Sequence, residues 1–232
     1  MKYVQNCLPG MGPVEKDPST GVKLDPKDLS TGPKLIYLDV ETTGISCPES
    51  GIIQLAGAIE IAGGEKKLFN YRMRPFPQDQ ISDEALAVNG VIRADLEGYE
   101  EPLIAFKDFV KTLSAYVDRY DRGDKFHLVG YNAHFDAGHL RAWFEKNGDK
   151  YFGSWFWHPP LDVMGFANIV LMRRRPALSN FKLATVAEAL GLEADEAQTH
   201  DALYDISLTR SIFHLLMDKL KEQPIRNGNA KA

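Results

Sequence analysis

The sequence predicts an α/β domain built on a mixed central sheet of about five strands, flanked by α-helices. Two observations lead to this prediction. First, three strand-like apolar stretches follow one another near residues 34–40, 51–64 and 66–75, as in a meander of neighbouring strands. Second, amphipathic helical stretches then alternate with further strand-like sequence, and helices in such an order usually cover a sheet.

Composition and a turn signal predict the strands. The stretch KLIYLDV, residues 34–40, is rich in the aliphatic, aromatic and β-branched residues of a buried strand. Gly63–Gly64 separates the next two stretches, and a glycine pair in a short loop is typical of a β-hairpin. A further strand is expected over residues 125–132.

Apolar residues at helical spacing predict the helices. Within residues 102–120, Phe106, Phe109 and Leu113 fall on one helix face. Pro102 stands where a proline favours the start of a helix. Further helices are predicted over residues 82–90, 133–148, 162–172, 182–190 and 200–221.

The distribution of residue types divides the chain into one domain and two ends. Residues 1–33 are rich in Pro, Gly, Asp and Lys without periodicity, which predicts an irregular N-terminal arm. Residues 34–221 carry the strand and helix patterns and are predicted to form the domain. Residues 222–232 are predicted to be a flexible C-terminal tail.

The bulk composition narrows the function classes. No apolar run approaches the roughly 18 residues that a membrane span needs, and no secretory signal is evident. Two cysteines, Cys7 and Cys47, cannot build a disulfide framework, so a cytoplasmic location is expected. The net charge of −5 does not favour a general nucleic-acid surface. A polyanionic ligand would need local basic groups or bound cations.

Acids occupy positions where apolar side chains are expected. Asp39 and Glu41 are two residues apart, so a strand points both of them toward the same face. Asp136 is spaced i, i+4 and i+7 with Leu140 and Trp143, which places it on a core-facing helix stripe. These three acids are therefore expected on surfaces that face the core.

A fourth acid, Asp205, shares the stripe of Leu208, Ile212 and Leu215 on the last helix. A single buried acid usually caps a helix or pairs with an arginine, because an unpaired buried charge is costly. Four acids without a matching set of Lys or Arg nearby in the sequence favour a bound divalent cation. Oxygen ligands without cysteine are typical of Mg²⁺ or Mn²⁺.

A histidine precedes the fourth acid. His200 and Asp205 are five residues apart, and on a regular helix that spacing separates the two side chains by about 140°. They converge only if His200 lies at the helix start, which Thr199 as N-cap would allow. Asp201, one turn before Asp205, is either an alternative ligand or an acid that stabilises the helix N-terminus.

Three stretches resemble, in order, the motifs of the DEDDh family of DnaQ-like 3′→5′ exonucleases. They are LDVETTG at residues 38–44, VGYNAHFD at 129–136 and HDALYD at 200–205. This family includes the proofreading subunit of bacterial DNA polymerase III, RNase T and oligoribonuclease. The resemblance extends over roughly residues 34–218, and three motifs in order form a specific signal. It implies an RNase H-like fold and release of nucleoside 5′-monophosphates from a 3′ end.

The resemblance also implies roles for individual residues. The positions of the four acids that bind two divalent metal ions, Mg²⁺ or Mn²⁺, are taken by Asp39, Glu41, Asp136 and Asp205. His200 takes the place of the general base, and its family-like spacing to Asp205 favours Asp205 over Asp201 as the ligand. Positions that contact the substrate are taken by Thr42, Thr43, Ile45, Asn132 and Phe135.

The chain departs from the family pattern at two places that bear on substrate. Residues Asn89 to Val91 read NGV where related sequences often carry His-Gly-Ile, so Asn89 is a substrate contact by position alone. The first motif differs from that of oligoribonucleases, which argues against a dinucleotide-specific RNA enzyme. The expected substrate is DNA in single-stranded form.

Several interpretations stay open at the level of sequence. An exoribonuclease of the RNase T or oligoribonuclease type would use the same acids. A non-catalytic module that binds nucleic acid or a polymerase is a further alternative, as is a structural protein whose acids pair with arginines. The expected partner is a nucleic-acid 3′ end, and a DNA polymerase or a second copy of the chain is a candidate partner.

Overall fold

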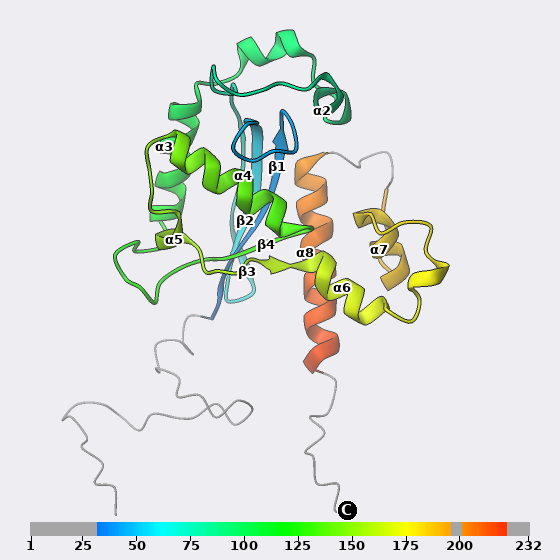
Figure 1. The fold of residues 1–232 in the computed structure, drawn as a ribbon. Helices are drawn as coiled ribbons and strands as arrows, with labels where there is room; N and C mark the ends of the chain where they lie inside the picture. Colours follow the sequence, from blue (N-terminus) through cyan, green and yellow to red (C-terminus); the bar gives the residue numbers. More distant parts are fainter. Residues whose placement is uncertain (1–31, 196–200, 222–232) are drawn as a thin grey trace, which may run out of the picture.

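The fold is built around a five-stranded mixed sheet with the strand order β3-β2-β1-β4-β5 (Figure 1). The computed structural model describes residues 32–195 and 201–221. The strands are β1 (Lys34–Thr42), β2 (Ile52–Ile61), β3 (Gly64–Arg72), β4 (His127–Gly130) and β5 (Leu161–Asp162). Most of the predicted arm, the predicted tail and His200 lie outside the described residues.

The sheet is antiparallel on one side of β1 and parallel on the other. β1, β2 and β3 form the predicted antiparallel meander, whereas β4 and β5 run parallel to β1. The hairpin turn lies one residue earlier than predicted, because Ala62 and Gly63 have positive φ angles of 52° and 77° and Gly64 already pairs with Ile61. Two successive residues with positive φ form the turn that suits a twisted hairpin.

Helices cover both faces of this sheet. They are α2 (Asp83–Val88), α3 (Pro102–Ser114), α4 (Ala133–Lys146), α5 (Phe152–Trp155), α6 (Val163–Leu171), α7 (Leu183–Leu190) and α8 (Ala202–Lys221), with 3-10 helices η1 (Arg93–Gly98) and η2 (Arg175–Ala177). α3 ends before the predicted residue 120. The Asp118 and Asp124 side chains accept backbone N–H groups of Tyr120 and Asp118, and such local bonds compete with a helix. In the described part of the chain, no helix is both long and apolar enough to cross a bilayer.

The side chains of β1 alternate between two apolar cores. Ile36, Leu38 and Val40 enter one core together with residues of α3, α4 and α5. Leu35 and Tyr37 enter the other core, which α6, α7 and α8 complete. Because both faces of β1 are covered, this strand is the centre of the domain, and Figure 1 shows α4 and α8 on either side of it.

An ion pair between the buried Glu60 and Arg210 connects α8 to the sheet. Glu60 of β2 is only 2% exposed, and its Oε2 accepts a hydrogen bond from Arg210 Nε at 2.7 Å. His214 Nε2 lies 2.9 Å from the same oxygen. Since Asp205 is on the same helix, this contact also fixes the position of that acid relative to β1.

Candidate active site

At the carboxyl end of β1, acidic side chains follow apolar ones on the same face of the strand. Asp39 and Glu41 continue the row that begins with Leu35 and Tyr37, as the period of a strand requires. The register between β1 and β2 shifts between Glu41 and Thr42. This irregularity ends the regular ladder directly after the two acids, where the chain leaves the sheet.

Asp136 reaches the same end of β1 from α4. Its side chain is only 4% exposed, and its Oδ1 accepts a hydrogen bond from the backbone N–H of Val40 at 3.1 Å. Asn132, before the first turn of α4, is exposed and has φ = 66° and ψ = 43°. This left-handed residue lets the chain turn from β4 into α4, and its N–H donates to Asp162 Oδ1 at 3.0 Å.

Asp205 lies in the first turn of α8, and its N–H donates to the carbonyl of Asp201 at 2.9 Å. The side chain of Asp201 has a different use. Its Oδ1 accepts the backbone N–H groups of Leu203 and Tyr204 at 3.0 and 3.1 Å, which is the bonding of a helix N-cap. This geometry supports Asp205, and not Asp201, as the acid that faces the site.

The pKa values show that the four carboxylates influence one another. Burial and then the charges of Asp136, Glu41 and Asp205 raise the pKa of Asp39 well above its usual range. Burial and the charge of Asp205 raise the pKa of Glu41 to about 7. The pKa of Asp136 also rises to about 7 because of burial, although the N–H of Val40 opposes the rise. The acids therefore meet as mutually repelling charges.

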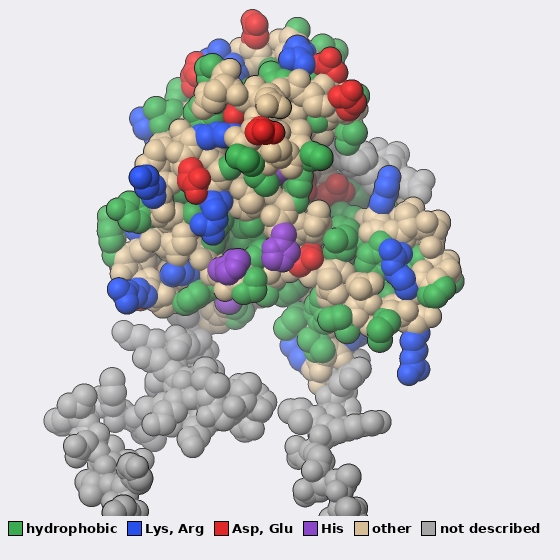
Figure 2. Space-filling view, viewed as in Figure 1, with side chains coloured by type: hydrophobic (Ala, Val, Ile, Leu, Met, Phe, Trp, Pro, Cys, Tyr) green, Lys and Arg blue, Asp and Glu red, His purple; other side chains and the backbone are tan. Residues whose placement is uncertain are grey.

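Three of these acids have no basic partner in the described part of the chain. None of the ion pairs among residues 32–195 and 201–221 involves Asp39, Glu41 or Asp136. Within those residues, no three His, Cys, Asp or Glu side chains are already arranged as a metal-binding group. Buried, repelling carboxylates nevertheless form a donor set that suits hard divalent cations, which would replace repulsion by attraction. Figure 2 shows acidic atoms recessed in a hollow at the upper right, while Lys and Arg are spread over the rest of this face.

Thr43 organises the loop that follows the acids. It is fully buried, and its Oγ1 donates to the carbonyl of Gln80 at 2.6 Å and accepts the N–H of Gly51 at 2.8 Å. Its N–H donates to the carbonyl of Gly51, and its carbonyl accepts the N–H of Ser82, both at 2.9 Å. Its hydrogen-bonding groups are thus used within the protein, so the structure gives Thr43 a positioning role beside the predicted substrate site.

Thr42 and Asn89 are also linked to each other. Asn89 Nδ2 donates to the carbonyl of Thr42 at 2.9 Å, and Thr42 Oγ1 donates to the carbonyl of Gly44 at 2.7 Å. These bonds hold the backbone that leads to Ile45, whose side chain is 88% exposed. Ile45 therefore presents an aliphatic side chain to solvent at the end of a hydrogen-bonded loop.

Phe135, a predicted substrate contact, lies against the ring of His139 on α4. Their ring centroids are 4.3 Å apart, and Phe135 packs against the apolar core. His139 is 1% exposed, and its Nδ1 lies 3.1 Å from the carbonyl of Phe135 and 3.4 Å from Cys47 Sγ. His139 was missed because its contact with the Cys47 loop joins residues far apart in sequence. Its only signal is its position one turn after Asp136.

A mixed sheet whose central strand ends in clustered acids defines the class of RNase H-like nuclease folds. Residues 36–213 match the sequence model of the RNase_T exonuclease family. This match covers well over half of the chain, and the protein belongs to that family. The predicted DEDDh resemblance and the predicted α/β fold are confirmed.

Two relatives match in different ways. PolC-type DNA polymerase III of Oceanobacillus iheyensis is 28% identical over 192 residues, which are 83% of this chain and 12% of that polymerase. Ribonuclease T of Shewanella frigidimarina is 25% identical over 194 residues, which are 80% of this chain and 83% of that enzyme. The chain therefore corresponds to a small part of the first relative and to most of the second.

Among solved structures, the zinc-bound ExoI–ssDNA complex of E. coli resembles the chain with a TM-score of 0.63 and 17% identity. The likeness covers 82% of this chain and 41% of ExoI. At this level of identity, the comparison supports the shared fold.

Proposed function

We propose that the chain is a metal-dependent 3′→5′ exonuclease that hydrolyses single-stranded DNA to nucleoside 5′-monophosphates. The observation that supports this proposal is the buried carboxylate cluster at the end of β1. Burial and neighbouring charge raise the pKa values of Glu41 and Asp136 to about 7. Such acids are costly to keep ionised without a cation, which is a reason to expect divalent ions at this place.

The four acids are proposed to hold two divalent ions, Mg²⁺ or Mn²⁺: Asp39, Glu41, Asp136 and Asp205. When bound, the ions would supply positive charge to the attacking and leaving oxygens of a phosphodiester. The chain itself sets the ligand positions. The N–H of Val40 holds the Asp136 carboxylate, and the pairing of Glu60 with Arg210 holds the helix that carries Asp205.

The remaining roles concern the proton and the substrate. His200, which lies outside the described residues, is proposed to accept a proton from the attacking water, as a group that titrates near neutral pH can. Ile45, exposed beside the acids, is proposed to pack on the 3′-terminal base. Asn89, Thr42 and Thr43 support that contact by bracing the loop, and Asn132 and Phe135 line the approach from α4.

DNA is the preferred substrate class in this proposal. The motif DVETTG at residues 39–44 departs from the oligoribonuclease type, and one relative is named as a DNA polymerase. The resemblance to a solved ExoI–ssDNA complex agrees with a single strand. A polymerase partner would follow from the first of these relatives.

An exoribonuclease of the RNase T type is the second candidate. It is favoured by one observation, which is that the likeness to Ribonuclease T extends over 83% of that enzyme. The acids serve both substrates equally, because the bond that is broken is the same.

Degradation of matched 5′-labelled DNA and RNA strands tests the proposal. We expect DNA to shorten stepwise from a free 3′ end in Mg²⁺ or Mn²⁺, to be protected by a blocked 3′ end, and to be stable in EDTA. Asp39→Asn, which keeps the size of the side chain, is expected to abolish both cleavage and metal binding. Degradation of RNA alone would select the exoribonuclease. Intact strands with either nucleic acid would select a binding module.

A further inference from the structure

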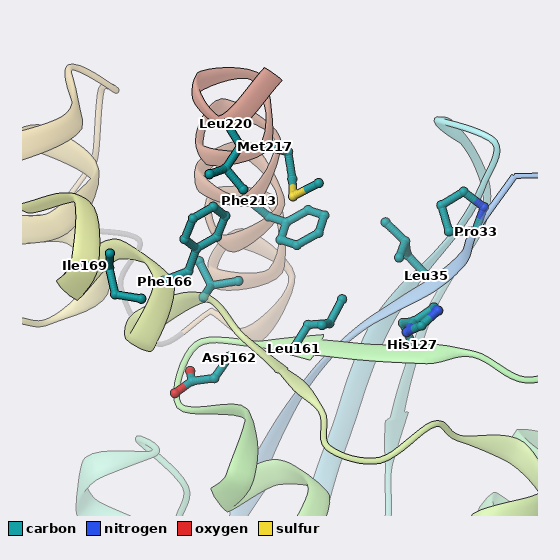
Figure 3. A pocket seen from close by; sticks show the side chains of 11 residues that line it. Pro33, Leu35, His127, Leu161, Asp162, Phe166, Ile169, Phe213, Met217 and Leu220 are labelled. Atoms are coloured by element: carbon teal, nitrogen blue, oxygen red, sulfur yellow. The ribbon is translucent and has the colours of Figure 1, made fainter. Parts of the chain in front are cut away.

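A second hollow lies on the α8 side of the sheet, at the start of β1. Its volume is about 570 Å³, within the size range of about 300–1,000 Å³ in which proteins bind ligands. Figure 3 shows Phe166, Phe213, Met217 and Leu220 from α6 and α8 around this space, with Leu35 and Pro33 on the opposite side. It lies at the opposite end of β1 from Asp39 and Glu41.

The walls of this hollow are mostly apolar and suit apolar side chains. Ile169 and Leu220 line it and are 69% and 53% exposed. Asp162 also lines it, but its Oδ1 already accepts the N–H groups of Asn132 and Met164. Burial lowers the pKa of His127, so this imidazole favours its neutral form.

The N-terminal segment of the chain leads to this hollow. Pro33 is one of the lining residues, and residues 1–32 precede it in the chain. The large aliphatic residues nearest upstream are Leu29 and Leu24. At about 3.3–3.6 Å per residue, Leu29 reaches up to about 14 Å from Pro33 and Leu24 up to about 30 Å. Both leucines can therefore reach the hollow from their own chain.

Other occupants are less well supported by the chain. Residues 222–232 follow Leu220 closely, but Ile225 is their only large apolar residue. A second copy of the chain would have to bind without a covalent link. A tethered segment has an effective concentration of the order of mM, which favours the segment that begins at Pro33.

We propose that residues 22–29, VKLDPKDL, dock in cis into the hollow between α6, α8 and the start of β1. Leu24 and Leu29 fill the apolar space, and the charged residues between them face water. The domain then extends upstream of residue 34, and this surface is occupied by the chain's own segment.

Cysteine pairs in the full-length chain test the proposal directly. In a background of Cys7→Ser and Cys47→Ser, Leu29→Cys is combined with Ile169→Cys on the hollow, or with Asn168→Cys as the matched control. Asn168 is exposed on the same helix and does not line the hollow. Under mild oxidation we expect an intramolecular disulfide with Cys at 169 at least about tenfold faster than at 168. Equal rates, or disulfides that join two chains, overturn the proposal.

Thermal unfolding gives a test without cysteines. Leu24→Asp combined with Leu29→Asp is expected to lower the Tm by about 5 °C, because leucines move from an apolar site to water. The matched control, Ser19→Asp with Ser30→Asp, adds the same charge and is expected to leave the Tm unchanged. In an Ile169→Asp background, the leucine substitutions are expected to have a smaller effect, because the sites are coupled. Equal Tm values for the leucine and serine variants overturn the proposal.

Discussion

Replacing Glu41 by Gln is expected to stabilise the metal-free protein at pH 8 and to leave its stability nearly unchanged at pH 4.5. Glu41 lies in the cluster with Asp39 and Asp205, and burial and the charge of Asp205 raise its pKa. Gln keeps the size of the side chain but has no charge at any pH. The substitution therefore mimics the protonated form of Glu41.

The magnitude follows from the pKa. A rise from the ordinary value of 4.5 to about 7 corresponds to about 3 kcal/mol, at about 1.4 kcal/mol per pH unit. The folded protein retains this proton at pH values where the unfolded chain has already released it. Stability is therefore present in full below pH 4.5, is lost as the pH rises through about 7, and stays lost above it. Glu41→Gln is expected to recover up to about 3 kcal/mol at pH 8.

Urea unfolding in EDTA at both pH values measures this effect. The matched control is Glu97→Gln, which removes an exposed carboxylate of η1 and is expected to change stability little at either pH. Adding Mn²⁺ at pH 8 is expected to stabilise the wild type more than Glu41→Gln, because a ligand has been lost. If Glu41→Gln is neutral or destabilising at pH 8 in EDTA, the carboxylates do not repel one another. The basis for the proposed metal site is then removed.

Three further predictions concern residues around the cluster. His200→Ala is expected to lower kcat for strand hydrolysis by at least about 100-fold and to retain Mn²⁺ affinity in calorimetric titration. Loss of both hydrolysis and Mn²⁺ affinity would make His200 a metal ligand. Thr43→Val removes the hydroxyl that serves Gln80 and Gly51 and is expected to cost about 1–3 kcal/mol in urea unfolding; unchanged stability would contradict its bracing role. Arg210→Ala leaves the buried Glu60 without its arginine and is expected to cost about 3–5 kcal/mol, whereas an unchanged Tm would mean that α8 is held otherwise.

Local patterns predicted most of the fold because the two-residue period of strands and the 3.6-residue period of helices are both clear in this chain. The alternation in β1 and the apolar stripe of α3 each report directly on burial. Boundaries were less accurate where local side-chain bonds decided them. α3 ends at Ser114 because Asp118 and Asp124 form side-chain hydrogen bonds in the turn that follows it. Hydrophobic periodicity does not predict such a turn.

The candidate site divides in the same way. Its acids were recognisable because Asp136 interrupts an apolar stripe, which is a local pattern. The hydrogen bonds that hold the loop could not be recognised from the sequence. The bonds of Thr43 to Gln80 and of Asn89 to Thr42 join residues about forty positions apart. A polar residue in a loop carries no sequence signal that separates a substrate contact from a structural bond. Thr43 and Asn89 were assigned to the substrate by their positions in the family pattern, and the structure adds internal hydrogen-bond partners for both side chains.

β1 and α8 each contribute to two surfaces on the same side of the sheet. The acids lie at one end of both elements, and the apolar hollow lies at the other end. Along β1, Leu35 faces the apolar hollow and Asp39 joins the acids. Along α8, Asp205 reaches the acids, whereas Met217 lines the hollow. Repelling carboxylates at one end weaken the contact between β1 and α8, and apolar burial at the other end strengthens it. A segment docked in the hollow would thus help to hold α8 in the position that the acids require. Loss of Leu24 and Leu29 is then expected to weaken cation binding at the proposed metal site.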